Sequence, residues 1–441
     1  MTPHKGPVRP NSAIPAPADV RVTGLGSESD GLAQLPDSTR LFVPLTLPGE
    51  LVRVRPTTRR GDGWAAEVES VLEPSPDRIA PPCRHFGTCG GCTLQHWHPD
   101  PYLAWKVGML DAALRRAGFP DVPMAPAARS HPAERRRMDL AVRRAPTGIL
   151  LGLHRLRATD VVDLAECRVL DPALATLLAP LRDVLRRLQA VRREASVVAN
   201  LLPGGPDLLL RTDAALTTPD RTTLTAFARA HGIPRIAWAQ GQAAPETACL
   251  LRPATLSLSG VTVAPPPGAF LQATASGEAA IIAAVLAALP AKLAPRARIG
   301  ELYAGCGTLT FALAQRARVT AWEGDAASVA ALRQAANQAG LAGRVEVFPR
   351  DLARQPLQVK ELGGFAVLVL DPPHDGAAAQ MPAIAVAGVP VVVYVSCNPA
   401  ALGRDAAVLG QMGYRLTTVQ PVDQFLWSAR LESVAVFVRS R

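Results

Sequence analysis

The 441-residue chain contains almost no lysine. Lysine occurs only at positions 5, 106, 292 and 360, so arginine carries nearly all of the positive charge behind a net charge of +10. Guanidinium groups match phosphate oxygens with paired hydrogen bonds, which favours a polyanionic partner such as RNA. A biased genomic composition would produce the same excess. The basic segment 134–144 is either an RNA-contacting ridge or a solvated charged face.

A long uninterrupted apolar segment is also lacking. No stretch of about eighteen apolar residues, the length that a membrane helix needs, is free of charge or proline. Residues 1–19 are rich in proline and polar side chains, and they lack the apolar core of a signal peptide. We therefore expect a cytoplasmic protein that does not associate with membranes, and we expect it to act as a monomer.

The second of the two Cys-x2-Cys pairs of common zinc ribbons is absent. The seven cysteines are an odd number in a compartment expected to be reducing, which disfavours a disulfide framework. Cys83, Cys89 and Cys92 lie within ten residues of one another, and Cys167 supplies a fourth thiolate far downstream. Four thiolates could hold a tetrahedral zinc ion or an iron–sulfur cluster, and the spacing does not choose between them. Because the second Cys-x2-Cys pair is missing, we favour an iron–sulfur cluster over zinc.

The distribution of strands and helices predicts several domains. Short alternating strands with glycine turns over residues 20–72 are typical of a small OB-like β-barrel. Strands and helices alternate regularly over the last third, which predicts an α/β, Rossmann-like domain with a doubly wound, mostly parallel sheet. We expect a flexible tail over residues 1–17, the β-barrel over 18–76, a mixed α+β central domain with the cysteine site over 77–265, and the Rossmann-like domain over 266–441.

Three expected strand ends in the last domain carry chemical groups. Residues 298–303 lead into a turn with Gly305 and Gly307, and the next strand ends at Glu323, whose carboxylate could accept both ribose hydroxyls of an adenosine. The three-glycine fingerprint of a dinucleotide fold is missing, so we favour S-adenosyl-L-methionine (SAM) over a nicotinamide cofactor. A later strand ends in Asp371, and two prolines hold its carboxylate at the cleft.

The β-branched run of residues 391–396 predicts a buried strand that delivers Cys397 to the rim of the sheet, where an Asn-Pro pair ends it. A thiolate that adds to C6 of uracil makes an enolate whose C5 can attack a sulfonium methyl, and a base must then remove the C5 proton. Cys397 fits the nucleophile and Glu432 fits the base. The commoner fate of an unpaired cysteine is to be a small buried hydrophobe, and Cys306 in the glycine turn is an example.

Together these motifs resemble the RNA uracil-5-methyltransferase family, specifically the bacterial 23S ribosomal RNA branch that carries a [4Fe-4S] cluster. The likeness covers nearly the whole chain from residue 20. The matching segments are residues 83–106, Phe270-Leu271-Gln272, residues 301–308, Asp371-Pro372-Pro373, Ser396-Cys397-Asn398-Pro399, and Asp423 with Glu432. The resemblance implies a SAM-dependent enzyme that methylates C5 of a specific uridine in 23S rRNA through a covalent Cys–C6 adduct.

The resemblance also implies the role of individual positions. The β-barrel would be a TRAM domain that binds RNA, and Asp371 would lie where the methyl donor and the uracil meet. Cys397 matches the nucleophile and Glu432 matches the general base. The SAM-site positions are matched by Gln272, Tyr303, Glu323 and Asp371, and the cluster ligands are matched by Cys83, Cys89, Cys92 and Cys167.

Three departures from the family pattern surround the expected site. His374 stands where the family usually has Arg after Asp-Pro-Pro, and Thr274 stands where an Asn is expected. Residues 423–430 read Asp-Gln-Phe-Leu-Trp-Ser-Ala-Arg in place of Asp-Met-Phe-Pro-His-Thr-x-His. These changes alter the walls of the base pocket, so they bear on the choice of substrate more than on the chemistry.

Two other functions are compatible with part of the sequence. Cytosine-5 methylation of RNA uses the same thiol addition, but such enzymes typically carry a cysteine in the Asp-Pro-Pro region, and residues 371–379 contain none. A non-catalytic factor that binds rRNA or assists ribosome assembly would explain the altered segment 424–430. The presence of both Cys397 and Glu432 argues for an enzyme instead.

Overall fold

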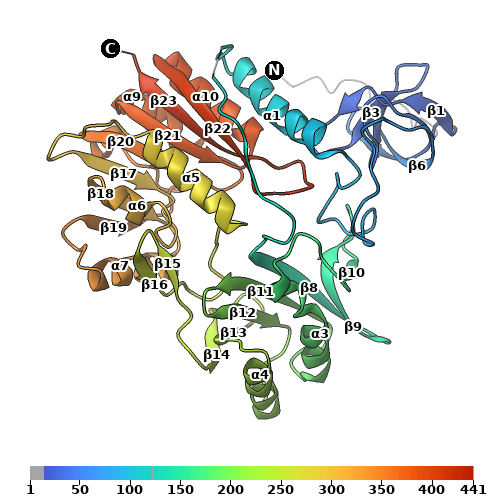
Figure 1. Cartoon of the computed structure of the whole chain (residues 1–441), viewed down its shortest axis with the longest axis horizontal. Helices are drawn as coiled ribbons and strands as arrows, with labels where there is room; N and C mark the ends of the chain where they lie inside the picture. Colours follow the sequence, from blue (N-terminus) through green and yellow to red (C-terminus); the bar gives the residue numbers. More distant parts are fainter. Residues whose placement is uncertain (1–13, 122, 441) are drawn as a thin grey trace, which may run out of the picture. The chain divides into compact units, whose positions relative to one another are not determined.

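A computed structural model describes residues 14–121 and 123–440 (Figure 1). Residues 1–13 of the predicted flexible tail, which covers residues 1–17, therefore lie outside the described residues. The chain forms two compact units. The first contains the chain up to residue 87 with residues 92–102 and 427–429, and the second contains residues 88–91, 103–426 and 430 onward. The predicted boundary between residues 265 and 266 falls inside the second unit.

The first unit is built on a six-stranded sheet with the order β1-β5-β6-β4-β3-β2. Its strands are β1 (Ala18–Arg21), β2 (Gly24–Leu25), β3 (Gly31–Gln34), β4 (Arg40–Val43), β5 (Leu51–Arg60) and β6 (Gly63–Glu73). Alternate side chains of the long β5–β6 hairpin point inward, and Val52, Val54 and Trp64 join Leu41 in one small core. The OB-like barrel remains a prediction for this sheet.

The second unit contains a central seven-stranded sheet with the order β10-β9-β8-β11-β12-β13-β14. Helices α3 and α4 pack on one face of this sheet around a leucine-rich core. The strands are β8 (Arg137–Ala145), β9 (Gly148–His154), β10 (Val161–Asp163), β11 (Glu194–Leu202), β12 (Gly205–Thr212), β13 (Arg235–Gln240) and β14 (Glu246–Leu250). The helices are α2 (Pro172–Ala175), α3 (Leu178–Arg187) and α4 (Thr218–Ala230), and β15 (Leu256–Leu258) pairs with β16 (Val261–Val263) nearby in the chain.

The apolar pattern of residues 173–193 suits one continuous helix, but the structure has the short α2 followed by α3, which ends at Arg187. Helix α3 ends because Leu188 is extended, with φ −74° and ψ 127°. The buried carboxylate of Asp220, at the start of α4, accepts hydrogen bonds from the backbone N–H of Gln189 at 2.8 Å and of Ala190 at 3.2 Å. These bonds hold the chain extended where the apolar pattern alone would continue the helix.

A second sheet in this unit has the order β19-β18-β17-β20-β21-β23-β22-β7. Its first five strands are parallel, and β23 is antiparallel to both of its neighbours. The strands are β7 (Ala128–Arg129), β17 (Arg298–Leu302), β18 (Arg318–Glu323), β19 (Val345–Pro349), β20 (Phe365–Leu370), β21 (Val391–Ser396), β22 (Tyr414–Asp423) and β23 (Glu432–Arg439). The predicted α/β class, with a mostly parallel sheet, is confirmed.

Helices cover both faces of this second sheet (Figure 1). One face packs against α5 (Ala275–Ala287), α6 (Thr310–Ala314) and α7 (Ala326–Gln338), and the other packs against α1 (Pro99–Arg116), α9 (Met381–Ala387) and α10 (Pro399–Gln411). The short α8 (Val359–Leu362) lies beside α9. Because both faces are buried, the central strands are almost wholly apolar. No described helix combines the length and apolarity needed to cross a membrane.

The helix α1 packs on this sheet and the strand β7 is its edge strand, although both precede the central sheet in the sequence. Leu110 and Leu114 of α1 are buried in the core beneath β20 and β21, and β7 pairs in parallel with the end of β22. The fully buried Lys106 Nζ lies 2.6 Å from Asp423 Oδ1. This ion pair ties α1 to the end of β22, next to the segment that begins with Gln424.

Candidate active site

Four parallel strands end at the sheet edge where the predicted site residues lie. Tyr303 directly follows β17, Glu323 ends β18, Asp371 follows β20 and Cys397 follows β21. The strand order runs outward in opposite directions from β17 and β20. Open α/β sheets bind ligands at such a switch point, outside the carboxyl ends of the strands. The topology therefore brings these four side chains to one edge.

The turn after β17 is tight and accepts little side-chain volume. Gly307 has φ +102°, and a Cβ atom there would lie 2.5 Å from Leu332 Cδ1 and 2.6 Å from Phe311 Cε2. The Gly305 N–H donates to Glu323 Oε2 at 2.8 Å, and the Asp325 N–H donates to Oε1 at 2.7 Å. The backbone thus fixes the carboxylate of Glu323 beside the glycine turn.

Tyr303 adopts a left-handed backbone conformation, with φ +65°. Such a conformation is uncommon for a residue with a large side chain, and it tends to persist at functional sites. Its N–H donates to the carbonyl of Trp322 at 2.9 Å, so the strained residue is held against the end of β18. Burial raises the pKa of the phenol to about 12, which leaves it neutral at physiological pH.

A chain of side-chain amides connects two buried carboxyl groups. Gln272 Nε2 donates to Asp371 Oδ2 at 3.3 Å, and Gln424 Nε2 donates to Gln272 Oε1 at 2.7 Å. Gln424 Nε2 also donates to Glu432 Oε2 at 3.0 Å, while its Oε1 accepts from the Ala273 N–H at 3.0 Å. Every hydrogen-bonding group of the Gln424 amide is therefore used, and the positions of Asp371 and Glu432 are coupled through it.

Both carboxyl groups of this network hold their protons more tightly than in water. Burial raises the pKa of Asp371, and burial together with the negative charge of Asp371 raises the pKa of Glu432. A base is most effective when its pKa lies near the working pH, because it is then both deprotonated often enough and strong enough to take a proton. The environment of Glu432 shifts the pKa of its carboxyl group toward the working pH.

Cys397 lies at the end of β21, beside Glu432 at the start of β23. The antiparallel register pairs Ser396 with Ser433, which places the residues that follow and precede them next to each other. Burial, and then the charge of Glu432, raise the pKa of the thiol to about 11. In this surrounding alone the sulfur is protonated at neutral pH, so it needs assistance to become a nucleophile.

The loop that follows Asp371 folds back toward the same thiol. His374 Nδ1 lies 3.7 Å from Cys397 Sγ, and the side chain of Asn398 donates to the carbonyl of His374 at 3.0 Å. The far end of the loop is fixed by Asp405, which accepts from the Tyr394 hydroxyl at 2.6 Å and from the Ala377 N–H at 2.7 Å. The loop is therefore anchored on both sides of His374.

Two residues of this arrangement were not assigned a role from the sequence. Gln424 stands out only as a departure from the family pattern, and its partners lie far away in the sequence. Glu301 is an acidic residue within the apolar strand β17, and that contrast was a usable signal. Burial raises the pKa of Glu301 to about 8, and among the described residues its Oε2 has no hydrogen-bond partner.

The four predicted metal ligands are divided between the two compact units. Cys83 and Cys92 belong to the first unit, whereas Cys89 and Cys167 belong to the second. Cys89 lies in a short loop whose Gly90 N–H donates to the His154 carbonyl at 2.9 Å. Within residues 14–121 and 123–440, no three His, Cys, Asp or Glu side chains are grouped so that they could hold a metal ion.

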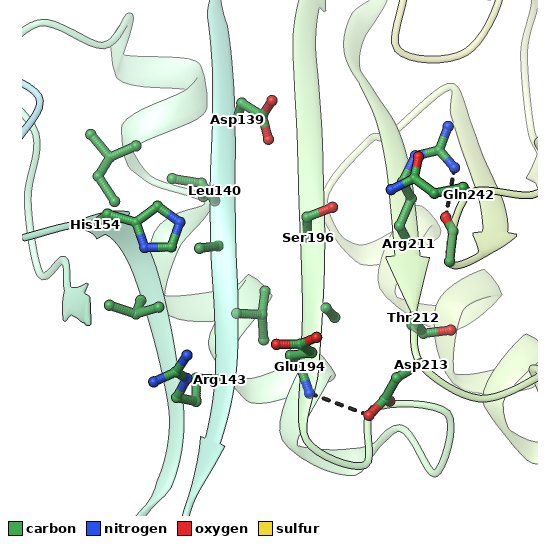
Figure 2. Close-up of a pocket in the computed structure, with 16 residues that line it drawn as sticks. Asp139, Leu140, Arg143, His154, Glu194, Ser196, Arg211, Thr212, Asp213 and Gln242 are labelled. Atoms are coloured by element: carbon green, nitrogen blue, oxygen red, sulfur yellow. Dashed lines mark hydrogen bonds between the residues drawn. The ribbon is translucent and has the colours of Figure 1, made fainter. Parts of the chain in front are cut away.

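A separate concavity of about 580 Å³ lies on the central sheet (Figure 2). Figure 2 shows Ser196 on the strand β11, with Asp139 and Arg143 on the neighbouring β8. Glu194 and Arg211 also line it, so charges of both signs are present. The predicted basic ridge over residues 134–144 coincides largely with β8, and its role in RNA contact remains a prediction. No cysteine lines this concavity, so it is distinct from the site at Cys397.

An open α/β sheet of this order, with a glycine turn after one strand and a carboxylate at the end of the next, is the architecture that SAM-dependent methyltransferases share with other nucleotide-binding α/β proteins. The structure is similar to the crystal structure of the Pyrococcus abyssi tRNA (uracil-54, C5)-methyltransferase in complex with S-adenosyl-L-homocysteine. The TM-score is 0.71 at 20% identity, over 96% of this chain and 100% of the other. This likeness establishes the fold. No family model matches the chain.

Sequence relatives establish the family. An uncharacterized RNA methyltransferase of Brucella suis is 38% identical over 422 residues, which cover 96% of this chain and 98% of the relative. A protein of Alkalilimnicola ehrlichii named 23S rRNA (uracil(1939)-C(5))-methyltransferase RlmD is 35% identical over 439 residues, 96% of this chain and 97% of the relative. The chain belongs to the RNA uracil-5-methyltransferase family and is a SAM-dependent RNA methyltransferase.

Proposed function

We propose that the protein methylates C5 of a specific uridine in 23S rRNA, with SAM as the methyl donor and Cys397 as a covalent nucleophile. The observation that carries the proposal is the pairing of β21 with β23, which sets Cys397 beside Glu432. The name of the A. ehrlichii relative supports 23S rRNA as the substrate. We propose further that the protein acts as a monomer in the cytoplasm.

The proposed reaction uses Cys397 and Glu432 in turn. The thiolate of Cys397 forms a bond to C6 of the uracil, and the ring electrons move toward O4 to make an enolate. The electron pair of the enolate then forms the bond from C5 to the methyl group, and the sulfonium sulfur of the donor would keep the electrons of its broken S–CH3 bond and become a neutral thioether. The carboxylate of Glu432 removes the proton from C5, the electron pair of that bond restores the C5–C6 double bond, and the S–C6 bond breaks. The sulfur keeps the electron pair of the broken bond, which regenerates Cys397.

The proposed SAM site consists of Gln272, Tyr303, Glu323 and Asp371. Each oxygen of Glu323 accepts one backbone N–H and has a second lone pair available, so the carboxylate can still accept both ribose hydroxyls of an adenosine. SAM would supply the electrophilic methyl group. The amide of Gln272 would position Asp371 where the donor and the uracil meet.

The proposed RNA contacts involve surfaces outside the catalytic edge. The sheet of the first unit would be a TRAM domain that binds RNA, and the basic residues of β8 would contact phosphates. A uracil inside a helix cannot reach a thiol at a sheet edge, so the target nucleotide would be flipped out of its stack. The departures at residues 424–430 and His374 would adapt the pocket to one particular uridine.

The [4Fe-4S] cluster on Cys83, Cys89, Cys92 and Cys167 is a proposal that rests on the sequence pattern, and no step of the reaction is assigned to it. Protein purified without oxygen is expected to be brown and to contain about four iron atoms per chain. The measurement is metal analysis with visible absorption spectroscopy, repeated on the variant Cys92→Ala. A colourless protein that contains zinc would show that the thiolates bind zinc instead.

A mechanism-based trap tests the proposed reaction. With 23S rRNA that contains 5-fluorouridine, methyl transfer should stop at the covalent stage, because the fluorine at C5 cannot be removed as a proton. We expect a SAM-dependent protein–RNA adduct that survives denaturation, and mapping its attachment point would identify the uridine. If SAM binds but no adduct forms, the protein acts on another base or is a non-catalytic rRNA-binding factor. A 5-methylcytidine product would identify the cytosine-5 alternative.

A further inference from the structure

A polar side chain that the proposed reaction does not use lies close to the sulfur of Cys397. His374 Nδ1 lies 3.7 Å from Sγ, within the range of a hydrogen bond that involves sulfur. His374 is also the residue at which the chain departs from the Asp-Pro-Pro-Arg pattern. We propose that His374 is a positioning residue that donates a hydrogen bond from Nδ1 to Cys397 and so stabilises its thiolate.

The neighbouring Asn398 determines which ring nitrogen carries the hydrogen. Asn398 Oδ1 accepts from the backbone N–H of Ala400 at 3.0 Å and of Ala401 at 3.3 Å, at the start of α10, so the orientation of the amide is fixed. Its Nδ2 consequently faces His374, 3.0 Å from the carbonyl oxygen and 3.4 Å from Nε2. Because Nδ2 can only donate, Nε2 serves as the acceptor and the hydrogen resides on Nδ1, which faces the sulfur.

The charges around the sulfur show why a donor is needed there. Glu432 on β23 and Asp371 at the end of β20 both oppose a negative charge on Cys397, and Arg430 just before β23 favours it. Burial is the largest effect, and it also opposes ionisation. A hydrogen bond to the charged form stabilises the thiolate directly. The S–H bond breaks, the proton passes to water, and the electron pair remains on Sγ opposite the Nδ1–H group.

The loop geometry keeps the donor in place. Pro372 and Pro373 restrict the backbone before His374, and Gly376 follows in a left-handed conformation with φ +82°. A Cβ atom on Gly376 would lie 2.6 Å from Asp405 Oδ2, so the loop packs directly on the residue that anchors its far end. The ring is exposed to solvent, which lets the proton of Cys397 leave to water.

Two substitutions separate a donor from a proton-accepting base. His374→Asn places an amide nitrogen at nearly the position of Nδ1, where it can donate a hydrogen bond but cannot take up a proton. His374→Ala removes both abilities. If the ring acts as a donor, the Asn variant should retain most of the Cys397 reactivity that the Ala variant loses. The matched control is His231→Ala, at the exposed end of α4 on the central sheet.

The experiment measures alkylation of Cys397 by iodoacetamide in the full-length protein without RNA or SAM, across neutral and alkaline pH. Mass spectrometry of the peptide that contains Cys397 reports the rate for this thiol alone. We expect His374→Ala to lower the alkylation rate at neutral pH about tenfold and to move the rate profile to higher pH, because thiolate is the reactive form. His374→Asn should stay close to the parent, and His231→Ala should match it.

Equal rates for the parent and His374→Ala would overturn the proposal. Equal loss in His374→Ala and His374→Asn would overturn the donor role and identify the ring as a base. The consequence for catalysis rests on the proposed function, but the alkylation result does not. If alkylation of Cys397 depends on His374 but no adduct forms on 5-fluorouridine RNA, this inference holds and the proposed reaction is refuted. If the adduct forms but alkylation does not depend on His374, the proposed reaction holds and this inference is refuted.

Discussion

Replacement of Cys397 by alanine is expected to lower methyl transfer by about 10⁴-fold or more, the scale of loss when a covalent nucleophile is removed. The loss follows because C5 of uracil cannot attack the methyl group until a thiolate has added to C6. The binding of SAM should persist, since none of the proposed SAM residues lies at the end of β21. The measurement is transfer of a radioactive methyl group from SAM to 23S rRNA lacking the modification.

A buried cysteine on a different sheet provides the matched control. Cys249 lies on β14, within the core of the central sheet, and Cys249→Ala removes a thiol without touching the catalytic edge. This variant should keep its activity, apart from a modest cost in stability. Methyl transfer by Cys397→Ala at a rate near that of Cys249→Ala would show that the reaction proceeds without the proposed adduct.

Glu432→Gln is expected to trap the enzyme on ordinary, unfluorinated RNA. Addition of Cys397 and transfer of the methyl group need no base at position 432, whereas release of the RNA requires loss of the C5 proton. Turnover should fall by about 10²–10⁴-fold, the usual contribution of general base catalysis. A methylated protein–RNA adduct should accumulate in the presence of SAM, visible as a slowly migrating band on a denaturing gel. Slow turnover without any such adduct would indicate that another residue removes the proton.

The same variant has a signature in stability that distinguishes it from a misfolded protein. Burial raises the pKa of Glu432, so the folded protein retains this proton in a pH interval where the unfolded chain has lost it. The free energy of unfolding of the parent therefore falls as the pH rises through that interval. A glutamine has no proton to lose, and its carbonyl can still accept from Gln424. Relative to the parent, Glu432→Gln should become more stable as the pH rises, in thermal melts.

The strands that carry the site were predictable because both faces of the sheet are buried. β20 ends directly before Asp371, where a strand end was predicted, and β21 occupies the predicted residues 391–396. Both could be found because a fully buried strand reads as a continuous run of apolar residues. The helix α9 was not predicted. Its sequence contains Pro382, which reads as a helix breaker but is compatible with the first turn of a helix, where its missing N–H has no partner to lose.

The sequence located single site residues better than the contacts between them. Cys397 and Asp371 could be placed at strand ends from the local pattern alone. The link from Gln272 through Gln424 to Glu432 joins parts of the chain that no local pattern relates, and it depends on the register of β22 with β23. The two-residue strand β7 is likewise a product of tertiary packing, because so short a segment has no periodicity to read.

The early position of α1 in the sequence has a consequence for biosynthesis. Leu110 and Leu114 leave the ribosome long before Val392, Val419 and Phe437, which complete the core around them. At translation rates of about 5–20 residues per second, the apolar side of this helix remains without these packing partners for roughly tens of seconds. During that interval it is a natural binding surface for chaperones. A chain that stalls before β22 leaves Lys106 without Asp423 and leaves the core around Leu110 incomplete. The catalytic layer is thus the last part of this protein to become complete, although one of its helices is among the first parts made.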